Sequence, residues 1–205
     1  MTRINVVRRD TMREQLAQRA AKLMAEDGIT DHTYAKRKAA KQLGATDTQH
    51  LPSNAEIDAA LRSFRLLFQS HSHPQVLGEL RAQALATMHL LADFHPYLTG
   101  SVLSGTAGEQ SDINIMLFCD DAKAVLLFLL KQQIDFADGE WKVHLGGHEE
   151  CVPSYTLRGE AGVQTHLIVL PENARHSGSR HPETHADIEA LANLLADSAL
   201  SGNAC

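Results

Sequence analysis

The segment 97–117, YLTGSVLSGTAGEQSDINIML, combines a glycine–serine pair with two polar residues that open an apolar run. Gly100 and Ser101 follow one short apolar run, and Asp112 and Asn114 begin the next. Because side chains alternate between the two faces of a β-strand, Asp112 and Asn114 are expected to share one face. Oxygen ligands placed in this way can hold Mg²⁺, whose octahedral shell is completed by phosphate oxygens and water. A glycine lets backbone N–H groups and a neighbouring hydroxyl approach phosphates closely, so the segment predicts phosphate recognition without a P-loop.

This arrangement resembles the signature of the DNA polymerase β superfamily of nucleotidyltransferases. The motif of the minimal nucleotidyltransferases typically reads GS…G…SDIDL, where this chain has GSVLSGTAGEQSDINI. The resemblance covers about residues 74–171, and it implies a mixed sheet flanked by helices. It implies the following site: phosphates on Gly100, Ser101 and Ser111, and Mg²⁺, or Mn²⁺ in its place, on Asp112 and Asn114.

The resemblance also implies a third carboxylate on a later strand, the general base that activates the acceptor hydroxyl. The run 163–170 is the expected strand, and it holds no Asp or Glu. Gln164 and His166 share one face of this strand, and Thr165 takes their place if the register is opposite. His166 can accept a proton near neutral pH or ligate a metal, so it is the candidate for the adapted catalytic role.

Asn114 stands where the family has its second carboxylate. A neutral amide oxygen can ligate Mg²⁺ but adds no charge, so we expect the metal to be held weakly and mainly by Asp112. Two functions stay open as a result. Either the chain transfers a nucleoside monophosphate from an NTP to an acceptor, which would be a small molecule, an RNA or a protein, or it is a catalytically inactive module that binds a nucleotide, a nucleic acid or a protein partner.

Residues 12–50 raise a third hypothesis, because AAKLMAEDGITDHTYAKRKAAKQLGA resembles the opening of a TetR-type DNA-binding domain. Residues 1–50 hold ten Lys and Arg against six Asp and Glu, whereas residues 51–205 hold nine against nineteen. This excess of positive charge is modest and is more typical of a solvated helix face than of a polyanion site. A strand-rich domain follows instead of a helical dimerisation bundle, so sequence-specific DNA binding is the least favoured of the three functions.

Other classes of site lack their residues. The chain contains no GxxxxGK[ST] and no GxSxG, and its three cysteines share no CxxC spacing that would indicate a zinc ribbon. His176, His181 and His185 invite a metal hypothesis. Thr184 as an N-cap, with Asp187 three residues later, explains that segment as the start of a helix, and this interpretation is favoured over a metal site.

Apolar residues recur at helical spacing over four early segments, about 10–27, 31–43, 53–71 and 74–95, and a basic run in the second is expected to be mostly exposed. Short apolar runs then predict strands at 97–102, 112–119, 141–145, 151–157 and 163–170. Helices are expected at 121–133 and at about 185–196. The fold class is therefore α+β, with an N-terminal helical region at about 1–72 and a nucleotidyltransferase-like domain at about 73–205.

The composition is that of an ordinary folded protein. Of the 205 residues, 43% are hydrophobic and 21% are charged, which is enough apolar material for a sizeable core. No stretch approaches the roughly 20 apolar residues that a membrane span needs, and the N-terminus lacks the apolar core of a signal peptide. We therefore expect a cytoplasmic protein without a membrane partner.

Overall fold

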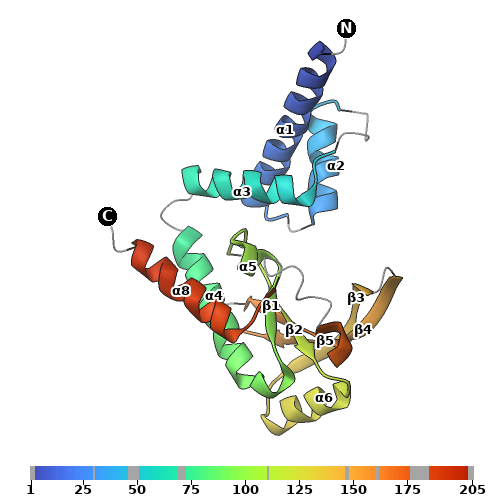
Figure 1. Cartoon of the computed structure of the whole chain (residues 1–205), viewed down its shortest axis with the longest axis vertical. Helices are drawn as coiled ribbons and strands as arrows, with labels where there is room; N and C mark the ends of the chain where they lie inside the picture. The colour runs from blue at the N-terminus through green and yellow to red at the C-terminus, as the bar shows by residue number, and fades with distance from the viewer. Residues whose placement is uncertain are drawn as a thin grey trace. The chain divides into compact units, whose positions relative to one another are not determined.

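The computed structural model describes residues 3–29, 31–45, 51–68, 73–109, 111–145, 148–159, 162–175 and 185–202. The chain forms two compact units, residues 1–75 and residues 76–205, each with its own core (Figure 1). The fold class is α+β, as the sequence predicts, because helices precede a six-stranded mixed sheet. No helix in these ranges is long and apolar enough to cross a membrane.

Unit 1 is built from helices α1 (Arg3–Glu26), α2 (His32–Gln42) and α3 (Asn54–Phe68). Alanines make up much of its core, which lets the helix backbones approach closely. Ser53 caps α3 in a capping box: its hydroxyl accepts from the N–H of Glu56 at 3.2 Å, and the Glu56 carboxylate accepts from the N–H of Ser53 at 2.7 Å. The polar residues at this helix start therefore satisfy one another.

The basic run of α2 is only partly the exposed face that the sequence predicts. Arg37 is exposed, but Lys36 and Lys38 are half-buried. Lys36 Nζ donates to Asn54 Oδ1 at 2.7 Å, and Lys38 Nζ donates to Asp27 Oδ2 at 2.8 Å. Two of the cations in the run thus hold α2 to the rest of unit 1, which leaves fewer for a polyanion.

Unit 2 follows an α+β order and closes around one sheet. Its elements are α4 (His73–Leu90), η2 (Ala92–Phe94), β1 (Tyr97–Thr99), α5 (Ser101–Ser104), β2 (Ile113–Phe118), α6 (Ala122–Lys131), β3 (Phe136–Leu145), β4 (His148–Arg158), β5 (Gln164–Leu170), η4 (Glu172–Ala174), β6 (His185–Ala186) and α8 (Ile188–Gly202). The strand order is β3-β4-β5-β2-β1-β6. Strands β2 and β5 are parallel, and the other neighbouring pairs are antiparallel.

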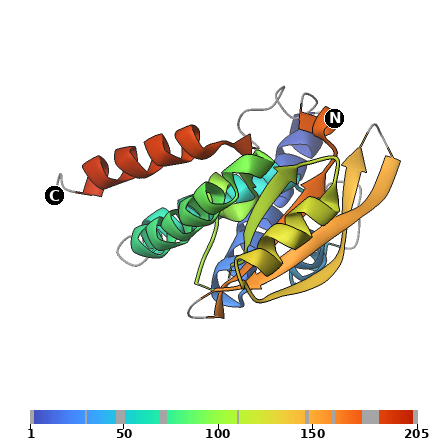
Figure 2. The same ribbon diagram turned by 90° about the horizontal axis from the view of Figure 1, so that it is seen from below.

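The two faces of this sheet differ in what packs on them. Ile113, Ile115 and Leu117 of β2 point into the larger core, which they share with residues of α4, α6 and α8. Figure 2 shows α6 lying along the strands. The other face carries a smaller apolar cluster whose members come from the strands and from η4. We call this second face, which also bears Asn114 and His166, the site face.

Several predicted boundaries are wrong: α1 begins at Arg3 and not at residue 10, β4 begins at His148 and not at residue 151, and α8 ends at Gly202 and not at residue 196. Three further differences have a clear local reason. The first strand ends at Thr99 and not at residue 102, because Gly100 has a φ of 77° and turns the chain into α5. Strand β3 begins at Phe136 and not at residue 141, because its pairing with β4 overrides weak strand formers such as Gly139. The last helix begins at Ile188, where the Asp187 carboxylate accepts from the N–H of Ala190 at 2.9 Å.

Candidate functional site

The site begins with the turn at Gly100, between β1 and α5. Gly100 has φ 77° and ψ −152°, a combination that is essentially restricted to glycine. A Cβ added there would lie 3.1 Å from Nδ2 of Asn114, so the turn also lacks room for a side chain. Both the backbone angles and the close approach to Asn114 require the glycine that the sequence motif supplies.

Arg81 supports this turn from α4. Its guanidinium is buried, and Nε and Nη2 donate to the carbonyl oxygens of Val102 and Leu103, each at 3.1 Å. These carbonyls belong to α5, which is too short to satisfy them within the helix. Burial lowers the pKa of the Arg81 guanidinium. No carboxylate in the described ranges pairs with it, so a buried cation lies against the carbonyl groups of α5, the helix that follows the glycine turn.

The sheet brings Asn114 and His166 together. Asn114 lies opposite Thr99 of β1 on one side and opposite His166 of β5 on the other. His166 Nε2 lies 3.5 Å from Oδ2 of Asp112, which is an electrostatic contact and not a short hydrogen bond. Thr165 is buried and pairs with Ile113. The register that the sequence left open therefore puts His166, and not Thr165, beside Asp112.

Asn114 has a buried oxygen without a partner. Its Oδ1 accepts no hydrogen bond from any described residue. Most buried polar atoms in proteins are paired, because an unpaired acceptor costs about 1–3 kcal/mol. An unpaired oxygen two residues from the half-exposed Asp112 carboxylate suits a cation or a hydrogen-bond donor. This pair of oxygen donors fits Mg²⁺ in chemistry, but it supplies a single negative charge.

His166 is fixed on two sides. Its Nδ1 lies 3.0 Å from the Thr156 hydroxyl on β4, and its ring centroid lies 5.1 Å from that of Trp141 on β3. A threonine hydroxyl can either donate to Nδ1 or accept from Nδ1–H, and in the neutral ring Nε2 is without a proton only in the second arrangement. In that tautomer, Nε2 can accept a proton from an acceptor hydroxyl.

The other predicted site residues, Ser101 and Ser111, make hydrogen bonds within their own loop or turn. Ser101 opens α5, and its carbonyl accepts from the N–H groups of Thr106 and Ala107. The Ser111 hydroxyl accepts from the N–H of Gly108 at 2.9 Å, so it closes the loop before β2. This contact gives Ser111 a structural role in the loop, whereas the phosphate contact stays a prediction.

No match was found when the chain was compared with protein-family models, curated proteins and solved structures. The case for a function therefore depends on the geometry of the site. The described part of the chain holds no group of three or more His, Cys, Asp or Glu that could bind a metal. Of the histidines considered for a metal, His176 and His181 lie outside the described residues, and His185 pairs with Thr99 in the sheet.

The sequence did not reveal Arg81, Trp141 or Thr156. Arg81 carries a signal in retrospect, since it is a lone charge on the apolar side of a predicted helix. Trp141 and Thr156 reach the site only through the pairing of β3, β4 and β5, and no local pattern encodes that pairing.

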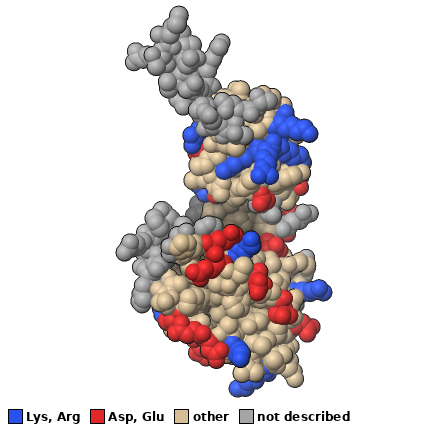
Figure 3. All heavy atoms as spheres, turned by 90° about the vertical axis from the view of Figure 1, so that its right-hand side faces the viewer, with Lys and Arg blue, Asp and Glu red and all other residues tan. Residues whose placement is uncertain are grey.

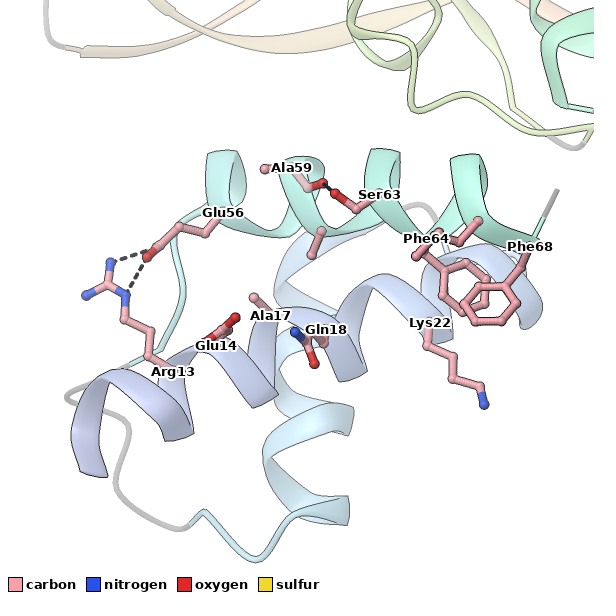
Figure 4. Close-up of a pocket in the computed structure, with 12 residues that line it drawn as sticks. Arg13, Glu14, Ala17, Gln18, Lys22, Glu56, Ala59, Ser63, Phe64 and Phe68 are labelled. Carbon is pink, nitrogen blue, oxygen red and sulfur yellow. Dashed lines mark hydrogen bonds and ion pairs between the residues drawn. The ribbon is translucent and has the colours of Figure 1, made fainter. Parts of the chain in front are cut away.

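Unit 1 contains a cleft of about 800 Å³ that the sequence also did not reveal (Figure 4). It lies between α1 and α3, with the rings of Phe64 and Phe68 at one end and the Arg13–Glu56 ion pair at the other. The Arg13 guanidinium donates two hydrogen bonds to the Glu56 carboxylate, at 2.8 and 2.7 Å. These polar groups satisfy one another, unlike Asn114 in unit 2.

Proposed function

We propose that the chain is a nucleotidyltransferase that transfers a nucleoside monophosphate from an NTP to the hydroxyl of an acceptor, with a weakened metal site. The observation that carries this proposal is the unpartnered Oδ1 of Asn114 beside the Asp112 carboxylate and the Gly100 turn. These groups combine an oxygen pair for a cation with a backbone turn for phosphates.

Each residue has a distinct task in the proposed reaction. Asp112 and Asn114 hold Mg²⁺, which would supply charge neutralisation at the phosphates. Backbone N–H groups at Gly100 and Ser101 donate to phosphate oxygens, and Arg81 holds the carbonyl groups of α5 that follow them. His166 Nε2 takes the proton of the acceptor hydroxyl as its oxygen attacks the α-phosphorus. The bond from the α-phosphorus to the bridging oxygen breaks, and pyrophosphate leaves.

One observation favours a second candidate, a catalytically inactive module that binds a nucleotide. Asn114 and His166 carry no carboxylate where the family has one, so Asp112 alone supplies a negative charge. Two-metal catalysis needs several anionic ligands to hold the ions against water. Such a module keeps phosphate contacts at the glycine turn and loses the chemical step.

A pyrophosphate-release assay separates these candidates. The whole chain is incubated with each radiolabelled NTP and with Mg²⁺ or Mn²⁺. We expect release in the native protein, none with Asp112→Ala, and faster release with Asn114→Asp, since the added carboxylate strengthens the metal site. Gly78→Ala, on α4 with nothing within 4 Å of the added Cβ, is the control variant.

Two results would count against the transferase. Release that is unchanged in Asp112→Ala would place the chemistry elsewhere. NTP binding without pyrophosphate release in either metal, both in the native protein and in Asn114→Asp, would favour the inactive module.

A further inference from the structure

Trp141 lies beside the candidate site on the site face of the sheet. It is the single tryptophan of the chain, and it is half-buried in the apolar cluster of that face. Its indole and the imidazole of His166 have ring centroids 5.1 Å apart and planes inclined by 44°. The two rings are therefore in contact without being stacked flat on each other.

Small side chains on β3 itself and their partners on the neighbouring strand β4 let the indole lie there. Gly139 pairs with Ser154, and Ala137 pairs with Thr156. These four residues lie between Trp141 and the His166 end of the site face. A Cβ added at Gly139 would already lie 3.4 Å from the Ser154 hydroxyl. Larger residues at these positions would occupy the space that the indole uses to reach His166.

Asp112, His166 and Trp141 consequently form a row of side chains in successive contact. The carboxylate lies 3.5 Å from the imidazole, and the imidazole contacts the indole. A nucleotide has a matching order of groups, with charged phosphates at one end and a flat aromatic base at the other. Stacking of a base on an aromatic side chain contributes about 1–3 kcal/mol and tolerates different bases, since each base has a π-face.

We propose that Trp141 binds the base of the nucleotide by stacking, while Gly100 and Asp112 take the phosphate end. This inference rests on the proposed function, because it assigns a second part of the same substrate to the same site. It adds the part of the site that binds a planar purine or pyrimidine ring. Neither the glycine–serine motif nor the metal ligands define this part. The site therefore takes nucleotides with weak discrimination between bases, and purines bind more tightly because they cover more of the indole.

Tryptophan-selective fluorescence of the native chain tests this directly, because Trp141 is the single tryptophan of the chain. The titrants are Mg·ATP, adenosine, inorganic triphosphate and ribose 5-phosphate, with excitation at the red edge of the tryptophan band to avoid absorption by adenine. We expect ATP and adenosine to quench the emission. Inorganic triphosphate and ribose 5-phosphate, which lack a base, should leave it unchanged.

Calorimetric titration with Mg·ATP supplies a measurement that does not depend on the tryptophan. Trp141→Leu keeps an apolar side chain but loses the flat ring, and we expect its Kd to rise on the order of tenfold. Trp141→Phe keeps a smaller ring and should give a smaller rise. Tyr97→Leu removes an aromatic ring from the same apolar cluster, away from His166, and should leave the Kd within about twofold as the matched control.

Three outcomes would overturn the inference. Native binding of ATP with unchanged emission, or native affinity in Trp141→Leu, would show that the base lies elsewhere. Quenching by inorganic triphosphate equal to that by ATP would show that the emission reports the phosphate end. Failure of the proposed function looks different, since adenosine would still quench a protein that releases no pyrophosphate, and this result supports base binding in an inactive module.

Discussion

The polar groups of unit 1 and those of the site in unit 2 are used in opposite ways. In unit 1, Arg13 pairs with Glu56, Lys38 with Asp27, and His32 with Asp58, at 2.7 to 2.8 Å. At the site, Asp112 has a contact of 3.5 Å and Asn114 Oδ1 has none among the described residues. Polar groups that satisfy one another add stability, whereas a buried acceptor without a partner costs stability and is typical of a site that pairs it with a ligand.

The charged side chains are also distributed differently on the two units. Figure 3 shows Lys and Arg side chains gathered on the visible face of unit 1, and mainly Asp and Glu side chains on that of unit 2. The cations of unit 1 invite a nucleic-acid hypothesis, yet five of them already pair within the unit: Arg13, Arg19, Lys22, Lys36 and Lys38. The excess of acidic residues in unit 2 makes a bound metal ion important for admitting a triphosphate.

The largest change in stability is expected from a substitution at Gly100, where the proposed site uses a strained backbone. Gly100→Ala should lower the free energy of unfolding of unit 2 by about 2 kcal/mol, because alanine is strained at this φ and ψ and its Cβ crowds Asn114. Urea denaturation measures the loss. The matched variant Gly78→Ala should instead stabilise by about 0.5–1 kcal/mol, because it adds a side chain to the interior of α4 without a clash. Equal stability of the two variants would remove the evidence for strain at the site.

A smaller change in stability is expected from a substitution in the Arg13–Glu56 pair, where the polar groups satisfy one another. Hydrogen bonds from Arg13, and then from Ser53, lower the pKa of Glu56 to about 2. A carboxyl whose folded pKa lies below its unfolded value of 4.5 stabilises the fold above pH 4.5, and the contribution disappears as the pH falls towards 2. Both side chains are partly exposed, so Glu56→Gln should cost about 1 kcal/mol at neutral pH.

The pH dependence provides the sharper measurement for Glu56. The unfolding free energy of the native protein should decrease between pH 4.5 and 2, and Glu56→Gln should show a shallower decrease in that window. Glu14→Gln, which removes an exposed carboxylate from the same cleft, is the matched control and should keep the native slope. If the unfolding free energy of Glu56→Gln falls with pH as steeply as that of the native protein, the role assigned to the Arg13–Glu56 pair is contradicted.

The smallest effect on stability is expected at Asn114. Asn114→Ala should change the free energy of unfolding by less than about 0.5 kcal/mol, because the gain from removing an unpaired buried acceptor offsets the packing that the side chain loses. The same variant should weaken the binding of Mn²⁺, measured by titration with electron paramagnetic resonance. A loss above about 1.5 kcal/mol would identify Asn114 as a structural residue, and the contrast between the two regions would then fail.

The sequence predicted what local patterns encode. Gly100 and Asp112 belong to one short segment, so their motif and the start of the next strand could be recognised without a structure. The register of His166 could not be predicted, because it depends on the pairing of β5 with a strand far away in the chain. The position of Trp141 depends on two further pairings and on small residues such as Gly139.

The first residues of helices α3 and α8 also show how far local sequence patterns can predict structure. Ser53 caps α3, and the capping box with Glu56 identifies it as the N-cap. Asp187 was expected inside a capping box begun by Thr184, which lies outside the described residues, and it caps α8 itself. Several residues in succession can cap a helix, and tertiary packing decides which of them does.

The parallel pairing of β2 with β5 also determines the order in which the site can form during folding. Helix α6 and the hairpin of β3 and β4 separate these strands in the chain, so their contact closes a long loop and is slow. The Gly100 turn and Asn114 come together through the short connection from β1 to β2. The phosphate end of the site therefore assembles early, and His166 with Trp141 completes it late, so partly folded chains lack the groups that we assign to the base and to proton transfer.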